Sequence, residues 1–192
     1  MDLEQALTTR RSIRRFSQRP LPASDLRAIA DAGRLAASAG NRQPCRFLAV
    51  SRRELVTAMH DNVAWLAGAG EPPLGAQAMA YMVILADPAV NRNYVSDCAA
   101  AAQNMLLAAH GRGIGGCWIG SVNRDAVRDL LGIPAQLEIH CVIALGYPEE
   151  RSVIGEVGDD APLTVTRDSK GVLHVPKREL EDLLRFERWG EK

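Results

Sequence analysis

The chain has 192 residues, of which 47% are apolar and 24% charged, and it carries 23 basic and 23 acidic side chains. These values are typical of one soluble globular domain with a hydrophobic core. The balanced charge argues against a nucleic-acid partner, and no apolar run approaches the roughly 18–20 residues of a membrane span. The acidic start, Met1–Glu4, also predicts no signal peptide.

The basic residues are concentrated near the start of the chain. Residues 1–53 hold eleven arginines, no lysine and four acids, a net charge of +7. If the first cluster of arginines is extended, Arg10, Ser12 and Arg14 share one face and Ile13 points the other way. Two guanidinium groups beside a hydroxyl suit a phosphate dianion. Taken alone, however, such a cluster is more often a solvated basic turn.

The first half of the chain alternates between helical and extended patterns. We expect helices over residues 3–10, 24–37 and 53–67, and strands over residues 46–51 and 81–86. Ser24 is a favourable N-cap for the second helix. Small residues from Ala36 to Asn41 end that helix, and they permit a backbone or flat ligand to approach closely. A Gly/Pro loop is expected from Gly68 to Gly75.

The second half continues the alternation as far as residue 145. Asp97 is expected to cap a long alanine-rich helix that ends near His110. Residues 114–119 and 137–145 read as strands, separated by a helix with Asn123 as its N-cap and Gly132 at its C-terminal end.

The tail has a different, more polar character. Residues 148–162 are rich in glycine and acids and read as a loop. Residues 163–166 and 172–175 alternate around a turn and predict a β-hairpin. Pro176 is expected to start a charged helix that ends near Arg188.

Common catalytic motifs are missing from the sequence. Gly111–Gly116 satisfies G-x-G-x-x-G, but a helix precedes it and a strand follows, the reverse of a dinucleotide-binding site. The four cysteines and four histidines show no metal-ligand spacing, so we expect no metal and reduced thiols in a cytoplasmic protein. No protein nucleophile or acid–base pair stands out, and we name no catalytic side chain. This pattern favours an enzyme whose chemistry belongs to an organic cofactor.

Four segments together resemble one known family, the nitroreductases. They are Arg10–Phe16, Ser38–Pro44, Gly113–Gly120 and Ala144–Pro148, and they occur in the family's order and spacing across roughly residues 3–150. The tail segment His174–Arg178 is also similar to the C-terminus of compact members.

The resemblance implies a fold and a reaction. The fold is α+β, a three-layer α/β/α sandwich with a mainly antiparallel central sheet. Residues 1–192 would form a single flavin mononucleotide (FMN)-binding domain, with residues 149–192 as a C-terminal extension of hairpin plus helix. The reaction would take hydride from NADH or NADPH and pass it to a small acceptor, a nitroaromatic or a quinone, by a ping-pong cycle. The protein would be a homodimer with FMN at the subunit interface.

The resemblance also assigns residues to the cofactor. Arg10, Ser12 and Arg14 would hold the FMN phosphate, and Arg11 would lie alongside. Ser38 and Asn41 would reach the flavin from the partner subunit. The flavin ring would lie against the segment Trp118, Ile119, Gly120 and Ser121, where a backbone N–H near Gly120 would donate to N5. Lys177 and Arg178 are weaker candidates for the phosphate.

Two departures bear on the substrate. The family usually has proline where Ala37 stands and often tryptophan where Cys45 stands, so the smaller Cys45 leaves the shape of the pocket open. Two alternatives to the proposed reaction therefore stay open: a flavin-binding sensor or storage module without turnover, and a family offshoot such as a reductive dehalogenase or a flavin-cleaving enzyme.

Overall fold

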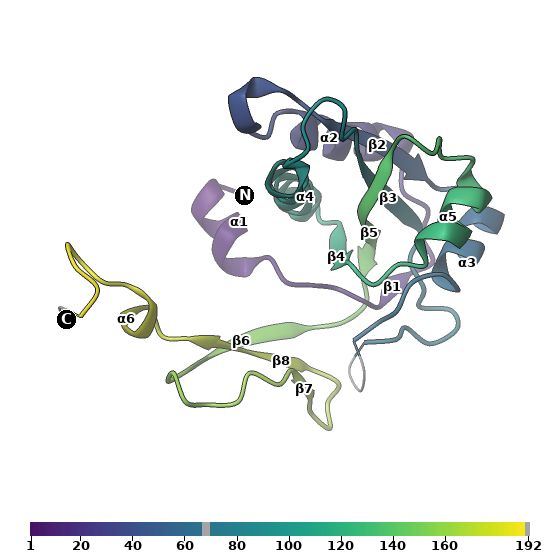
Figure 1. Cartoon of the computed structure of the whole chain (residues 1–192). Helices are drawn as coiled ribbons and strands as arrows, with labels where there is room; N and C mark the ends of the chain where they lie inside the picture. Colours follow the sequence, from purple (N-terminus) through teal and green to yellow (C-terminus); the bar gives the residue numbers. More distant parts are fainter. Residues whose placement is uncertain (67–69, 191–192) are drawn as a thin grey trace. The chain divides into compact units, whose positions relative to one another are not determined.

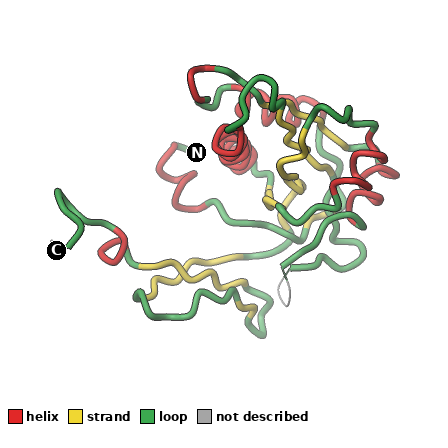
Figure 2. Tube along the Cα trace, viewed as in Figure 1, coloured by secondary structure: helices red, strands yellow, loops and turns green. Residues whose placement is uncertain are grey.

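The computed structural model describes residues 1–66 and 70–190. The chain divides into two compact units, Met1–Glu149 and Glu150–Lys192. Figures 1 and 2 show the helices and strands of both units.

The first unit is built on an antiparallel sheet with the order β1-β5-β3-β2. The short strand β4 also pairs with β5, through residues 142–146 of β5, whereas β1 pairs with Tyr147 and Pro148. The strands are β1 Phe16–Ser17, β2 Cys45–Val50, β3 Ala80–Ala86, β4 Gly115–Ile119 and β5 Glu138–Pro148. All four strands predicted in this unit, β2, β3, β4 and β5, are present, and no end is shifted by more than three residues.

Helices cover both faces of this sheet. They are α1 Leu3–Thr9, α2 Ala23–Arg34, α3 Arg53–His60, α4 Tyr94–Gly111 and α5 Arg124–Leu131, with one 3-10 turn, η1 Ala39–Asn41. Figure 1 shows α2 and α4 on one face and α3 and α5 on the other. This arrangement confirms the predicted α/β/α sandwich with a mainly antiparallel sheet.

Strand β3 shows how the sheet holds the two layers together, because all seven of its residues are buried. Tyr81 and Val83 belong to the hydrophobic cluster that includes α3 and α5. Met82 and Ile84 belong to the cluster that includes α2 and α4. Successive side chains of a strand point to opposite faces, so a continuous apolar run is what a doubly covered strand requires.

Helix α4 begins earlier than predicted. Its first residue is Tyr94, so Asp97 lies inside the first turn rather than at the cap. The buried Asp97 carboxylate instead accepts hydrogen bonds from the Ala39 backbone N–H and from the Asn91 side chain, both at 2.9 Å. Asp97 therefore anchors the η1 turn, a long-range role that sequence spacing does not reveal.

Helix α5 follows the prediction at both ends. The Asn123 side chain accepts a hydrogen bond from the Ala126 N–H at 3.4 Å. Gly132 ends the helix with a φ of 62°, the left-handed conformation that glycine adopts at low cost.

Helices α2 and α3 are shorter than predicted. Helix α2 starts after Pro22 and ends at Arg34, three residues before the expected end. Helix α3 ends at His60 because the chain then pairs elsewhere: Val63 forms a bridge with Val122. Residue 67 of the predicted helix and residues 68–69 of the predicted loop lie outside the described residues.

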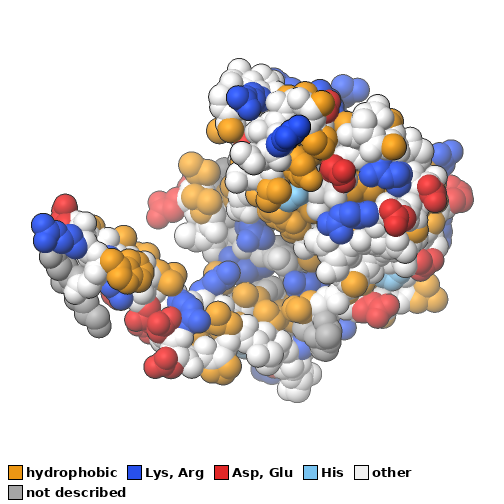
Figure 3. Space-filling model, viewed as in Figure 1, with side chains coloured by type: hydrophobic (Ala, Val, Ile, Leu, Met, Phe, Trp, Pro, Cys, Tyr) orange, Lys and Arg blue, Asp and Glu red, His pale blue; other side chains and the backbone are white. Residues whose placement is uncertain are grey.

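The second unit contains β6 Ser152–Val157, β7 Thr166–Arg167, β8 Leu173–Arg178 and the short helix α6 Leu180–Leu183. The predicted hairpin is present as β7 and β8, but β6 lies in the segment expected to be a loop and pairs with β8 in parallel. Pro176 lies within β8 rather than starting a helix, and α6 is one turn long. The α6 end exposes hydrophobic side chains, orange in Figure 3.

Among residues 1–66 and 70–190, no helix combines the length and the apolar character needed to cross a bilayer.

Candidate functional site

The first basic stretch, Arg10–Phe16, lies beside β4. Ser12 forms a parallel bridge with Gly116, and the Ile13 N–H donates to the Gly116 carbonyl at 3.1 Å. Ile13 is buried and packs on Gly115, where an added Cβ would come within 2.8 Å of the Ile13 side chain. The lack of a side chain at Gly115 therefore permits the first basic stretch to approach β4 closely.

This approach creates the pocket that we call the β4 pocket, with a volume of about 360 Å³. Its lining comes from Arg14, residues 64–66 and residues 117–121. Arg14 thus shares one pocket with Trp118, Ile119, Gly120 and Ser121. A larger hollow of about 630 Å³ elsewhere in this unit is lined by none of the predicted residues, so volume alone does not identify the site.

The other two residues of the predicted phosphate face, Ser12 and Arg10, precede Arg14 in the same stretch, and neither lines the β4 pocket. Ser12 is held by its bridge to Gly116, and Arg10 is half-buried. Burial lowers the pKa of Arg10, and its neighbour Cys117 partly offsets this effect. A partly desolvated guanidinium is stabilised by an anion, so the environment of Arg10 favours phosphate binding.

Arg11 has a different role from its neighbours. Its guanidinium donates to the carbonyls of Arg10 and Thr8, at 2.6 and 2.8 Å, and so binds carbonyls at the C-terminal end of α1. Burial, and then the charge of Arg10, lowers the pKa of Arg11. These contacts assign Arg11 a structural role at the end of α1.

The backbone of residues 118–121 is held from both sides. Arg124 donates to the Gly120 carbonyl at 3.3 Å, and the Ala64 N–H donates to the Ser121 carbonyl at 2.9 Å. Gly120 is exposed, and an added Cβ there would meet no atom within 4 Å. Ile119 is buried in the core, so it can contribute only its backbone to the pocket.

Sequence reasoning missed residues 64–66 and Cys117 as parts of this pocket. Trp65 lies in the segment expected to continue α3, and its indole Nε1 is buried with no hydrogen-bond partner among the residues that the structure describes. The pair Asp61-Asn62, two poor helix formers just after His60, was the available signal that the helix ends there. An orphaned donor at the pocket is consistent with a ligand that supplies an acceptor.

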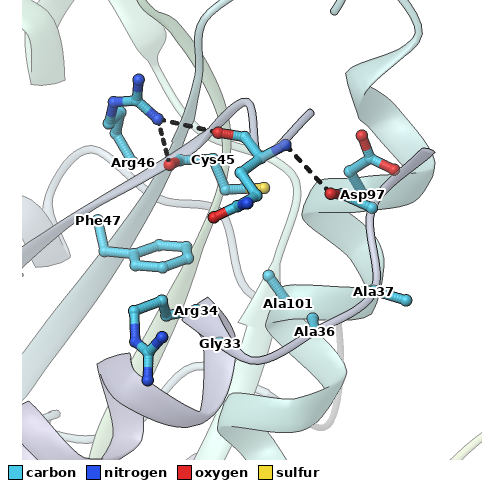
Figure 4. Close-up of a pocket in the computed structure, with 11 residues that line it drawn as sticks. Gly33, Arg34, Ala36, Ala37, Cys45, Arg46, Phe47, Asp97 and Ala101 are labelled. Atoms are coloured by element: carbon cyan, nitrogen blue, oxygen red, sulfur yellow. Dashed lines mark hydrogen bonds between the residues drawn. The ribbon is translucent and has the colours of Figure 1, made fainter. Parts of the chain in front are cut away.

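Ser38 and Asn41 do not join the β4 pocket within one chain. Ser38 lines a second pocket of about 200 Å³, which we call the α2 pocket, whereas Asn41 lines neither pocket. Figure 4 shows the α2 pocket with Cys45, Arg46 and Asp97 among its lining residues. The Ser38 hydroxyl accepts a hydrogen bond from the backbone N–H of Gln43 at 3.1 Å.

Lys177 and Arg178 belong to the second unit, at the end of β8. Lys177 is exposed, whereas Arg178 is half-buried and forms an ion pair with Asp159 at 2.7 Å. Phosphate binding by Arg178 would therefore compete with Asp159.

The site offers charged side chains and open backbone. In the described part of the chain, no three His, Cys, Asp or Glu side chains are placed to hold a metal ion. Arg10, Ser12 and Arg14 supply two guanidinium groups and a hydroxyl. Ile13, which lies between Ser12 and Arg14, packs on Gly115. The open backbone of Gly120 lies in the same pocket as Arg14. These residues fit a ligand that combines a phosphate with a flat ring.

Comparisons with known proteins agree with this geometry. The sequence profile of the Nitroreductase family matches residues 7–147. A protein of Archaeoglobus fulgidus with the provisional name NADH dehydrogenase/NAD(P)H nitroreductase is 40% identical over 159 residues, 79% of this chain and 88% of that protein.

Two similar solved structures contain FMN according to their descriptions. One is a provisionally named nitroreductase in complex with FMN from Desulfovibrio desulfuricans, with a TM-score of 0.69, 26% identity and 98% of each chain covered. The other is a nitroreductase with bound FMN from Desulfitobacterium hafniense, with a TM-score of 0.63, 26% identity, and 76% of this chain and 88% of that chain covered. With the family profile spanning most of the sequence, the chain belongs to the nitroreductase family.

Proposed function

We propose that this chain is an FMN-dependent NAD(P)H oxidoreductase that reduces a nitroaromatic, a quinone or a similar small electrophile by a ping-pong mechanism. The observation that carries the proposal is the β4 pocket, where Arg14 lies with the backbone of residues 118–121. The names of the relatives, which include NAD(P)H nitroreductase and FMN complexes, support the same cofactor and the same electron donor.

The phosphate end of the cofactor is assigned to the first basic stretch. Arg10 and Arg14 would each donate charge-assisted hydrogen bonds to the phosphate, with the Ser12 hydroxyl between them. Lys177 is a further candidate for the same phosphate. Arg178 is a weaker one because Asp159 already pairs with it.

The ring end of the cofactor is assigned to residues 118–121. Bound FMN supplies the redox chemistry, accepting hydride from the nicotinamide and passing electrons to the acceptor. The chain supplies position: Arg124 and Ala64 fix the backbone of this segment through the Gly120 and Ser121 carbonyls. A fixed N–H beside the ring would stabilise negative charge that develops there. We assign no catalytic side chain.

A shared site between two copies of the chain explains the position of Ser38 and Asn41. Helix α2 separates them from the first basic stretch, and its twelve residues, Ala23–Arg34, span about 18 Å at 1.5 Å per residue. Ser38 lines a different pocket from Arg14. In a twofold dimer, Ser38 and Asn41 of one copy would complete the β4 pocket of the other.

We further propose that residues 1–192 act as one FMN-binding domain with residues 149–192 as its C-terminal extension, working in the cytoplasm. The support for the location is chemical: all four cysteines are free thiols, and three of them are buried.

Anaerobic stopped-flow spectroscopy tests the reaction. NADH or NADPH should bleach the flavin absorbance, and a nitroaromatic or a quinone should restore it after the nicotinamide is removed. Steady-state rates at several acceptor concentrations should then give parallel double-reciprocal lines, as a ping-pong cycle requires.

The same experiment separates the alternatives. A sensor or storage module would bind flavin without turnover with any acceptor. A reductive dehalogenase would be reoxidised by halogenated acceptors in preference to nitro compounds, and a flavin-cleaving enzyme would consume its flavin. Purified protein that holds FAD, or that takes up no flavin on reconstitution, would overturn the proposal.

A further inference from the structure

Two cysteines that are distant in sequence lie side by side, and one of them, Cys45, lines the α2 pocket. The Cys45 and Cys98 sulfurs are 3.5 Å apart and share a hydrogen bond. Cys45 begins β2, and Cys98 lies in the first part of α4. In Figure 4 the Cys45 sulfur points toward the helix that carries Asp97 and Ala101.

The two thiols have different surroundings. Cys45 is partly exposed and lines the α2 pocket, with Arg46 next to it in sequence. Cys98 is fully buried. The bond from the Cys98 thiol lowers the pKa of Cys45, and the charge of Arg46 contributes in the same direction. The same bond, together with burial, raises the pKa of Cys98.

These different surroundings suit the two roles in a reactive thiol pair, an attacking thiol and a resolving thiol. Oxidants react with the thiolate, and reaction requires access from solvent. Cys45 is the thiol of the pair whose pKa is lowered and which reaches solvent, whereas Cys98, whose pKa is raised, is buried away from solvent. Cys98 is nevertheless within contact distance of any sulfur species formed on Cys45.

The geometry points to a peroxide-oxidised disulfide site in which Cys45 is the attacking thiol and Cys98 the resolving thiol. The Cys45 thiolate attacks one oxygen of hydrogen peroxide, the O–O bond breaks, and the released hydroxide takes up a proton to become water. Cys45 is then a sulfenic acid. The Cys98 sulfur attacks the Cys45 sulfur, the S–S bond forms, and the S–O bond breaks. The leaving hydroxide takes the Cys98 proton as a second water. Overall, two thiols lose two electrons and one peroxide becomes two waters.

The step requires only a small movement. A disulfide bond is about 2.05 Å long, so the two sulfurs must approach by roughly 1.5 Å. The Cys45 side chain faces a pocket of about 200 Å³, which leaves room for it to rotate. Asp97, next to Cys98, also holds the η1 turn through the Ala39 N–H. The cross-link would therefore strengthen the attachment of the turn that leads into β2.

Peptide mapping tests the site directly, because trypsin places the four cysteines in four different peptides. These are residues 43–46, 93–112, 113–124 and 129–151. The full-length protein, fully reduced and then freed of reductant, is treated with hydrogen peroxide in the absence of NADH and NADPH. Remaining thiols are blocked with iodoacetamide before digestion. We expect a linked pair of peptides 43–46 and 93–112, which separates again on treatment with dithiothreitol.

Variants assign the two roles. Cys45→Ser should abolish the linked peptides and leave Cys98 unoxidised at the same dose. Cys98→Ala should instead stop at a Cys45 sulfenic acid, which dimedone traps as an adduct on peptide 43–46. The matched controls are Cys141→Ser and Cys117→Ser, which remove the other two buried thiols and should still give the 45–98 link.

Clear results would overturn the proposal. One is a linked peptide that contains Cys141 or Cys117 in the wild-type protein. Another is full retention of four alkylated thiols at peroxide doses that already oxidise methionine. A melting curve of each variant guards against misfolding, and the wild-type mapping result stands without any variant.

Discussion

At the scale of single residues, the arginines of the first basic stretch divide by what they contact. Arg11 donates to the carbonyls at the end of α1, which makes it part of the fold. Arg14 lines the β4 pocket, and Arg10 is half-buried beside Cys117. Three arginines with the same chemistry therefore have separable roles, and substitution can distinguish them.

Replacing Arg14 with alanine should weaken FMN binding without unfolding the protein. The lost charge-assisted phosphate contact contributes on the order of 1.5–3 kcal/mol, so the Kd for FMN should rise roughly ten- to a hundred-fold. Riboflavin, which has no phosphate, should bind almost unchanged. Fluorescence titration of the stripped protein with each flavin measures both values.

Arg27→Ala is the matched control for this prediction, because Arg27 is exposed on α2 and lines no part of the β4 pocket. It removes the same charge and should leave both affinities unchanged. Equal losses of FMN and riboflavin affinity in Arg14→Ala would show that Arg14 acts on the fold rather than on the phosphate.

His140 should make stability depend on pH. Its ring lies edge-on to Trp118 and Tyr94, and burial, followed by the charge of Arg124, lowers its pKa. The unfolded chain therefore binds this proton at a higher pH than the folded protein does. Stability is full above the unfolded pKa, about 6.5, and falls as pH drops below it.

The measurement is the difference in Tm between pH 7.5 and pH 5.5. The wild type should melt at a lower temperature at pH 5.5, and the loss should be smaller in His140→Gln. Some loss should remain, because burial lowers the pKa of His110 as well. An identical pH dependence in the variant and the wild type would contradict the role of His140.

At the scale of elements, close contacts between strands decide where glycine is required. Gly146 in β5 faces Phe16, and an added Cβ would lie 2.8 Å from three atoms of the Phe16 side chain. Phe16 is fully buried and cannot move aside easily. Gly146→Ala should therefore reduce the free energy of unfolding by on the order of 1–3 kcal/mol, measured by urea denaturation.

Gly111→Ala is the control for the same chemical change. Gly111 is the last residue of α4, and an added Cβ there meets no atom within 4 Å. This variant should be neutral or more stable by up to about 1 kcal/mol. A cost at Gly146 no larger than at Gly111 would mean that Phe16 has room to shift.

Elements with strong local signals could be predicted from the sequence. Helix α5 carries both a side-chain cap at Asn123 and a glycine at position 132, and the structure contains both. Strand β3 is a continuous apolar run and is buried throughout. In each case the local preference and the tertiary environment favour the same conformation.

Elements that depend on distant partners could not be predicted. Helix α3 ends early because Val63 pairs with Val122, and β6 exists because it pairs with β8. Pro176 is tolerated in β8 because β7 pairs only with Leu173 and His174, so the strand is an edge at the proline. None of these pairings leaves a periodic pattern in its own segment.

The candidate site likewise contains some residues that the sequence predicts and others that it does not. The spacing of Arg10, Ser12 and Arg14 predicts a common phosphate-binding face, and the family resemblance assigns residues 118–121 to the flavin ring. Of these residues, the structure brings Arg14 and residues 118–121 to one pocket. Trp65 was missed because its position depends on the end of α3. The separation of Ser38 and Asn41 from Arg14 follows from the length of helix α2, which the sequence pattern already indicates.

At the scale of the whole molecule, the proposal of a site shared between two copies predicts complementation between two defective chains. One carries Arg10→Ala and Arg14→Ala, and the other carries Ser38→Ala and Asn41→Ala. Each homodimer should bind FMN weakly, because both of its sites lack one half. Refolded together, each heterodimer should regain one intact site, measured as flavin bound per dimer after gel filtration.

Each variant refolded alone is the control for this experiment. Distinct affinity tags on the two chains allow the heterodimer to be isolated and its flavin content measured directly. If isolated heterodimers hold no more flavin than either homodimer, the two halves of the site do not come from different chains.

The division into two units at Glu149 coincides with a change in lysine content. The three lysines of the chain are Lys170, Lys177 and Lys192, so no lysine side chain lies in Met1–Glu149. A protease that cuts only after lysine can therefore trim the second unit and cannot touch the first. Cleavage after Lys170 would leave the β4 pocket on an uncut chain, and separating the released β8 from β6 would then remove Lys177 and Arg178. Flavin retained by that fragment would then report what the first unit binds without them, in native protein and without any substitution.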